Sequence, residues 1–277
     1  MNAFKSAEGK KAVIKYYSSL LEKAEIPLEE MSIHTSYGNA FVIAAGNKEN
    51  PPLILLHGSS MNSAMWLKDI EHYSAQYRVY APDLPGEPGR SSDEQLPFDT
   101  MDYVDWLCDV IDMLSITEVS LVGISLGAWL SAKFAIHYPG KVNKLVLLCP
   151  AGIGGQNHAF KDIAMSLLPK GDEGVAELFR LINGGVPVRE AVLNYQKFLV
   201  TVFNTRQEPI PLFADEELCA LTMPCLLIVG EKDIMIDSLE TVSRVKKLVS
   251  KASIMLIPDA GHILIGYAKK ISHFLQM

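Results

Sequence analysis

The hydrophobic positions of this chain form short continuous runs that alternate with segments of helical spacing. The runs that predict strands are LILLH (53–57), RVYAPD (78–83), VSLVGI (119–124), KLVLLCP (144–150), CLLIVG (225–230) and SIMLIPD (253–259). They do not alternate between apolar and polar residues, so both faces of each strand should be buried, as in a parallel sheet covered by helices. Apolar residues at three- and four-residue spacing predict the covering helices near 62–73, 99–115, 126–138, 238–250 and 263–276.

Three further segments lie outside this alternation. Residues 7–25 have the spacing of an amphipathic helix, and residues 31–45 indicate two strands around a Tyr-Gly-Asn turn. From 152 to 222 the spacing is helical and no similar strand occurs, and about 70 residues are too many for a structureless loop. We therefore expect an N-terminal helical segment (1–29), a core of 30–151 and 223–277, and a helical cap (152–222).

Composition and charge narrow the class of protein. The 277 residues carry a net charge of −7, without the basic stripe of a nucleic-acid binder. The four cysteines include no C-x-x-C pair, which favours reduced thiols in a cytoplasmic protein over disulfides or a zinc site. No secretory signal or membrane-spanning run is recognisable. We expect no nucleic-acid or membrane partner, and the sequence leaves the oligomeric state open.

A serine stands at the joint between the predicted strand 119–124 and the helix that follows it. The joint reads GISLG (123–127), so Ser125 has a glycine two residues away on each side. A serine on such a sharp turn projects beyond the carboxyl end of its strand, where α/β sheets bind ligands. The glycines allow the strand and helix backbones to approach closely because they carry no Cβ. Ser125 is therefore the candidate nucleophile.

A serine hydroxyl is a weak nucleophile and needs a general base that is itself oriented by another group. His262, in IPDAGHILIG, follows the last predicted strand and should open the last helix, which places it at the same edge of the sheet. His57, at the end of LILLH, is the alternative base, although it could simply shape the loop HGSSMNS.

The orienting acid should also follow a strand. Asp233 lies three residues past CLLIVG and is the candidate, with Asp259, three residues before His262, as the alternative. Asp237 is expected to cap the following helix, and Asp83 to hold the turn-rich loop that it begins.

Negative charge that develops on a substrate oxygen needs two backbone donors. The N–H of Leu126, directly after the nucleophile, is one candidate. The other comes from the loop after LILLHG, and Ser59 is the simplest choice, with Ser60 and Met61 as alternatives.

Taken in order, five motifs resemble those of the α/β-hydrolase fold: LLHGSS (55–60), DLPGEPGRSS (83–92), GISLG (123–127), VGEKD (229–233) and DAGH (259–262). The resemblance covers residues from about 30 to 277 and matches the triad order Ser, Asp, His. It implies a mostly parallel twisted sheet with helices on both faces and a helical cap insertion. One departure is visible, since many relatives have D-x-x-G-x-G-x-S whereas Glu87 and Pro88 lengthen this loop.

The residues and the resemblance together predict a serine hydrolase of the carboxylesterase type, in which Ser125, His262 and Asp233 act as nucleophile, base and orienting acid. No cofactor or metal is implied. The same triad could serve a C–C bond hydrolase, a lactonase or a cofactor-free haloperoxidase. A non-catalytic binder of a small apolar ligand is the alternative outside enzymes.

The composition of the predicted cap indicates the polarity of the substrate. Its sequence contains many large apolar residues, among them Phe160, Phe179 and Phe198, while its charges lie beside glycines or at helix starts. We therefore expect a mostly apolar pocket above Ser125 and a small, mostly apolar ester as the substrate.

Overall fold

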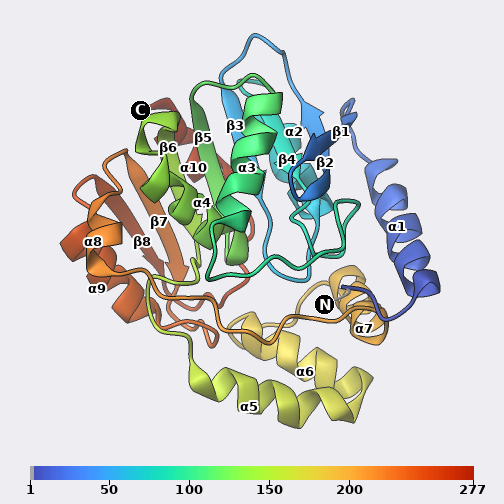
Figure 1. Ribbon diagram of the computed structural model, residues 1–277. Helices are drawn as coiled ribbons and strands as arrows, with labels where there is room; N and C mark the ends of the chain where they lie inside the picture. The colour runs from blue at the N-terminus through green and yellow to red at the C-terminus, as the bar shows by residue number, and fades with distance from the viewer. Residues whose placement is uncertain (1–2) are drawn as a thin grey trace.

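The computed structural model describes residues 3–277, except for the side chain of His158, so Met1 and Asn2 of the expected N-terminal segment lie outside the described residues. One eight-stranded sheet runs through the molecule in the order β1-β2-β4-β3-β5-β6-β7-β8 (Figure 1). The strands are β1 Glu29–Thr35, β2 Gly38–Ala45, β3 Pro52–Leu56, β4 Arg78–Pro82, β5 Val119–Ile124, β6 Val142–Leu148, β7 Cys225–Gly230 and β8 Ala252–Ile257.

The hydrophobic pattern accounts for the direction of the strands. β3 to β8 pair in parallel, whereas β1 and β2 form an antiparallel hairpin that adds to the edge at β4. Every residue of β5 and β7 is buried, as expected for strands covered on both faces. The predicted α/β fold with a mostly parallel sheet is confirmed.

Helices cover the sheet on both faces. α3 (Asp102–Met113) and α4 (Leu126–His137) lie on one face, and α2 (Leu67–Tyr73) and α10 (Ala268–Gln276) lie together on the other (Figure 1). α9 (Ser238–Leu248) packs along β7 and β8, and α8 (Asp215–Cys219) packs on α9. Short 3₁₀ helices occur at η1 (Ser63–Trp66) and η2 (Pro139–Lys141). These helices bury the apolar residues that project from the sheet.

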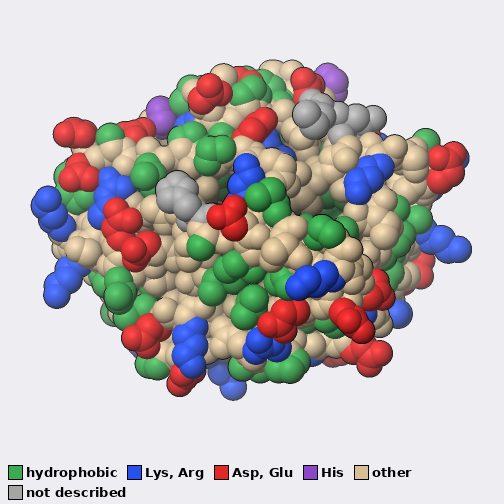
Figure 2. All heavy atoms as spheres, turned by 90° about the horizontal axis from the view of Figure 1, so that it is seen from below, with side chains coloured by type: hydrophobic (Ala, Val, Ile, Leu, Met, Phe, Trp, Pro, Cys, Tyr) green, Lys and Arg blue, Asp and Glu red, His purple; other side chains and the backbone are tan. Residues whose placement is uncertain are grey.

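Between β6 and β7 the chain leaves the sheet and forms a helical layer below it (Figure 1). The layer consists of α5 (His158–Leu167), η3 (Leu168–Lys170), α6 (Asp172–Ile182) and α7 (Glu190–Val202). An extended segment, residues 203–214, then returns to the core, and we call it the strap. In Figure 2, which shows this side of the molecule, charged side chains of both signs are mixed with hydrophobic ones. The cap charges expected in solvent, Lys161, Asp172, Glu173 and Arg189, are indeed exposed.

The N-terminal helix α1 (Ala7–Leu21) joins this layer to the core. Toward the layer, the Phe4 and Phe203 rings pack edge to face at 5.6 Å, and the Tyr16 and Tyr195 rings stack at 4.8 Å. Toward the core, the Tyr17 hydroxyl donates to the buried Asp83 carboxylate at 3.0 Å. α1 therefore packs against both parts of the molecule.

Across the described residues, none of the helices has the length and apolar character required to span a membrane.

Candidate active site

Ser125 lies on a strained turn between β5 and α4. Its φ of 53° and ψ of −113° place it at positive φ, which a residue other than glycine adopts only where the surroundings enforce it. A Cβ on Gly123 would come within 2.3 Å of the Gly127 carbonyl oxygen, and a Cβ on Gly127 within 2.1 Å of the Leu56 carbonyl oxygen. The two glycines therefore let α4 start directly on top of β5 and β3, and the Ser125 side chain stays partly exposed.

His262 and Asp233 form a hydrogen-bonded pair at the same edge of the sheet. His262 Nδ1 lies 2.6 Å from Asp233 Oδ2, and the Asp233 side chain is completely buried. The other carboxylate oxygen accepts the backbone N–H groups of Met235 and Ile236 at 2.7 and 3.2 Å. These contacts fix the carboxylate, which in turn fixes the imidazole ring.

The pairing also determines which ring nitrogen is available. A carboxylate only accepts, so Nδ1 carries the proton and Nε2 has the free lone pair. Nε2 is buried and has no hydrogen-bond partner among the described residues. An imidazole in this tautomer can take a proton from a neighbouring hydroxyl.

Burial and pairing shift the pKa values of His262 and Asp233 in opposite directions. Burial lowers the pKa of His262, but the adjacent Asp233 carboxylate stabilises the imidazolium and leaves the pKa above its ordinary 6.5. Burial raises the pKa of Asp233, but the His262 charge and the two backbone N–H groups bring it below its ordinary value. The structure thus favours an ionised carboxylate beside the imidazole.

The expectation that His262 opens the last helix is wrong. α10 begins at Ala268, and the residues before it form a loop in which Gly266 has a φ of 86°. The His262 N–H instead donates to the Ile182 carbonyl at the end of α6, at 2.8 Å. A Cβ on Gly261 would lie 2.3 Å from that same oxygen, so the absence of a side chain lets the cap lie directly on the histidine loop.

Cys149 lies between the serine and histidine regions, a position that its place in an apolar run does not predict. The Ser125 N–H donates to the Leu148 carbonyl at 2.9 Å, and Cys149 follows directly. The sulfur of Cys149 lies within 4.8 Å of donor atoms of Asp233 and His262. Burial raises the pKa of the Cys149 thiol, which keeps it neutral.

Cys149, Asp233 and His262 are donor types that bind metals. However, the hydrogen bond between Asp233 and His262 occupies one donor atom of each. Cys149 Sγ and His262 Nε2 remain, which is fewer than the three or four protein ligands of a zinc site.

The alternative base and acids have other partners. Both ring nitrogens of the buried His57 are used, since Nε2 accepts the Leu84 N–H at 2.9 Å and Nδ1 lies 2.8 Å from the Gly58 carbonyl. Asp259 is exposed and pairs with Lys232 at 2.5 Å. Asp237 caps α9 as expected, and Asp83 accepts backbone N–H groups from Ser63 and Arg90.

The oxyanion candidates differ in whether their N–H groups are free. The Ser60 N–H donates to Glu87 Oε2 at 2.6 Å and is therefore occupied. In the part of the chain that the structure describes, the N–H groups of Ser59 and Leu126 make no such bond. This supports Ser59 over Ser60 as the second donor.

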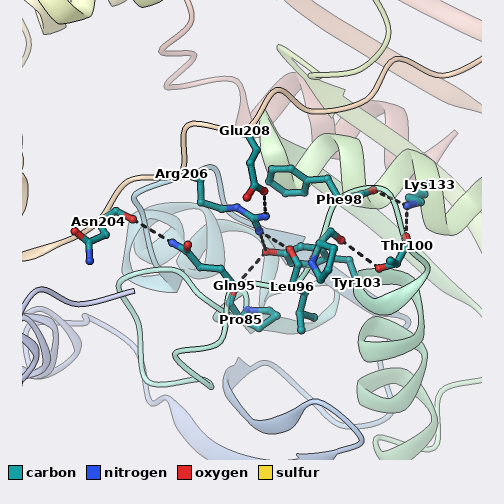
Figure 3. Close-up of polar contacts among 11 residues, drawn as sticks. Pro85, Gln95, Leu96, Phe98, Thr100, Tyr103, Lys133, Asn204, Arg206 and Glu208 are labelled. Atoms are coloured by element: carbon teal, nitrogen blue, oxygen red, sulfur yellow. Dashed lines mark hydrogen bonds and ion pairs between the residues drawn. The ribbon is translucent and has the colours of Figure 1, made fainter. Parts of the chain in front are cut away.

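Arg206 of the strap contacts the core (Figure 3), next to Thr205, which lies beside Ser60. The hydrophobic pattern of the sequence does not predict this contact. The Arg206 guanidinium lies 3.8 Å from the Phe98 ring centroid and donates to the Tyr103 hydroxyl at 3.2 Å. It also bonds the Leu96 carbonyl and pairs with Glu208. The strap thus has a fixed position beside the loop that carries Glu87.

Comparison with known proteins agrees with the fold. Residues 53–271 match the Alpha/beta hydrolase family. An uncharacterised carboxylesterase, nap, from Bacillus subtilis is 30% identical over 273 residues, which covers 91% of this chain and 87% of the relative. Carboxylesterase YbfK of the same organism is 29% identical over 90% of this chain and 86% of its own length. Among solved structures, the naproxen esterase (carboxylesterase NP) of B. subtilis superposes with a TM-score of 0.84 at 26% identity, covering 98% of this chain and 97% of the other.

Proposed function

We propose, since this chain belongs to the alpha/beta hydrolase family, that its hydrolytic reaction passes through an acyl-enzyme on Ser125. Similarity to the carboxylesterases identifies the protein as an enzyme that hydrolyses ester bonds. The observation that carries the assignment of residues is the buried His262–Asp233 pair with a free Nε2, at the same sheet edge as the strained Ser125 turn.

In the proposed reaction, Ser125 Oγ attacks the ester carbonyl carbon while His262 Nε2 takes the hydroxyl proton. The carbonyl oxygen becomes an oxyanion held by the N–H groups of Ser59 and Leu126. The intermediate collapses, the ester C–O bond breaks, and His262 returns the proton to the leaving alcohol. Water then attacks the acyl-enzyme with His262 again as base, releasing the acid and restoring Ser125. Asp233 orients the imidazole and stabilises its charged form throughout.

The other reactions considered for this triad are less well supported. The relatives with about 30% identity over most of the chain are carboxylesterases, and none of those comparisons favours a C–C bond hydrolase, lactonase or haloperoxidase. A non-catalytic binder would have no need of a buried carboxylate that fixes one histidine tautomer.

Covalent labelling tests the nucleophile directly. A fluorophosphonate should react once per chain, and peptide mapping should place the adduct on Ser125. Mapping of the adduct to another serine would refute the assignment. Labelling of Ser125 without turnover of any ester would favour a different acyl substrate.

The acidic limb of the pH–rate profile should report His262. The base must be neutral, so kcat/KM should fall as the pH drops through its pKa, and Asp233 places that pKa above 6.5. Rates of ester hydrolysis between pH 5 and 8 provide the measurement. A profile that is flat over this range would argue against a histidine base.

We further propose that residues 152–222 form the substrate-binding cap, because α5 to α7 are inserted between β6 and β7. The catalytic core then consists of residues 30–151 and 223–277.

Not all large apolar residues of the cap line a pocket. Leu199 and Phe203 pack with Phe4 and Val13, and Phe213 joins the main core. Phe160, Phe179 and Leu181 are only partly buried by the protein and could contact an apolar acyl group.

An apolar pocket of limited size predicts a maximum in activity with chain length. Each methylene that fits should contribute up to about 0.8 kcal/mol to transition-state binding. For para-nitrophenyl acetate, butyrate, hexanoate and decanoate, kcat/KM should rise and then fall. A preference for a carboxylate-bearing ester over its neutral isostere would contradict the apolar cap.

The cytoplasm is the compartment we propose. All four cysteines are free thiols, which is their usual state in a reducing compartment. Detection of the protein in fractionated cells tests this placement.

A further inference from the structure

Glu87 is a buried acid that the proposed reaction does not use. It is one of the two residues that lengthen the loop after β4, and the residue is only 3% exposed. Its Oε2 accepts the Ser60 N–H at 2.6 Å, the one hydrogen bond found for this carboxyl group among the described residues. Burial of a carboxyl group with a single hydrogen bond costs free energy, so the surrounding structure must hold Glu87 in this position.

The partner of Glu87 is directly connected to the oxyanion candidate. Ser60 follows Ser59 and has a φ of 57°, a left-handed conformation that a serine does not adopt without restraint. Its hydroxyl also lies 3.2 Å from the Thr205 hydroxyl on the strap. The peptide between residues 59 and 60 is planar, so a bond to its N–H fixes that plane and limits rotation about ψ of Ser59. The Ser59 N–H lies in the preceding peptide, which is joined to this plane through the Ser59 Cα.

Burial favours the neutral form of Glu87, whereas the nearby positive charge of Arg206 opposes it. Arg206 on the strap and Tyr103 on α3 are the charged and titratable groups that interact with it among the described residues. The donors of Arg206 are directed to the Leu96 carbonyl, the Tyr103 hydroxyl and Glu208, as Figure 3 shows in part. No ion pair to Glu87 was found in the described part of the chain.

We propose that Glu87 is a positioning residue for ester hydrolysis, which holds the Ser60 amide through its buried carboxyl group and thereby orients the Ser59 amide toward the acyl oxygen. This inference rests on the proposed function. Burial raises the pKa of Glu87 to about 8, although the Ser60 N–H and Arg206 oppose that change. Above this pH a buried negative charge forms beside the oxyanion site, where it repels the charge that develops in the transition state.

Two substitutions separate the effects of the hydrogen bond and of the charge. Glu87→Gln keeps an acceptor of the same shape but cannot ionise. Glu87→Ala removes the acceptor and leaves the Ser60 N–H without a partner. The exposed Glu94, in the same loop, supplies the matched control Glu94→Gln.

We expect kcat of the unmodified enzyme to fall with a midpoint near pH 8, and this alkaline limb to be absent from Glu87→Gln but present in Glu94→Gln. At pH 7, Glu87→Ala should lower kcat by about 10- to 100-fold with little change in KM, because a small displacement of a catalytic group has effects of this size. The inference is overturned if Glu87→Gln keeps the alkaline limb. It is also overturned if a folded Glu87→Ala has normal kcat.

Fluorophosphonate labelling distinguishes failure of this inference from failure of the proposed function. If Ser125 is labelled and the Glu87 variants behave as the unmodified enzyme, only the role of Glu87 is wrong. If Ser125 is not labelled, the proposed function itself fails. Thermal unfolding and circular dichroism check the fold, and if Glu87→Ala does not fold, the pH profile of Glu87→Gln decides.

Discussion

Replacing Ser125 by alanine should lower kcat for ester hydrolysis by on the order of 10⁶-fold, the size of effect that loss of a serine nucleophile has in a comparable triad. In the proposed reaction the Ser125 Oγ atom forms the acyl-enzyme, so no other side chain replaces it. The fold should persist, because the strain of the turn lies in the backbone and alanine retains the Cβ.

Steady-state kinetics on para-nitrophenyl butyrate, with the fluorophosphonate adduct measured by mass spectrometry, provide the test. Ser166→Ala is a suitable control, since Ser166 is exposed on α5 and its hydroxyl donates to the Ile163 carbonyl of the same helix. Residual activity in Ser125→Ala near that of the control would place the nucleophile elsewhere.

Replacing Asp233 by asparagine should lower kcat by on the order of 10⁴-fold, as loss of the orienting carboxylate does in serine hydrolases. The amide retains the volume of the carboxylate and can still accept from the Met235 N–H. It cannot stabilise the imidazolium, however, and it can favour the wrong histidine tautomer. The acidic limb of the pH profile should therefore move to lower pH.

The matched control for this substitution is Asp259→Asn. Asp259 lies three residues before His262, but it is 82% exposed and pairs with Lys232. It should have nearly normal kcat. If Asp259→Asn instead has the larger effect and Asp233→Asn is almost silent, the choice of acid is wrong.

The hydrophobic pattern of the sequence predicts the structure correctly where residues close in sequence determine the conformation. The buried strands appear as continuous apolar runs, and the pairing of Asp233 with His262 agrees with the expectation that both follow strands at one sheet edge. Parallel topology accounts for this arrangement, because it brings the ends of successive strands to the same edge.

The hydrophobic pattern of the sequence does not predict features that depend on contacts between distant residues. The start of α10 was misplaced because residues 263–267 are apolar enough for a helix, while the His262 N–H bonds the cap and Gly266 takes a positive φ. Cys149 lies beside His262, and Arg206 lies over the Phe98 ring, because of tertiary packing. No periodicity in the sequence encodes such contacts.

The packing of α1 on the cap has a consequence for how the chain folds. The Phe4–Phe203 contact is supported by backbone bonds from Lys5 to Val202 and from Asn204 to Ala3. Lys5 also donates through its side chain to the Val200 carbonyl, 195 positions away. During synthesis Phe4 and Lys5 therefore lack these partners until most of the chain has left the ribosome. Contacts of such long range slow folding, so completion of the cap should be a late event.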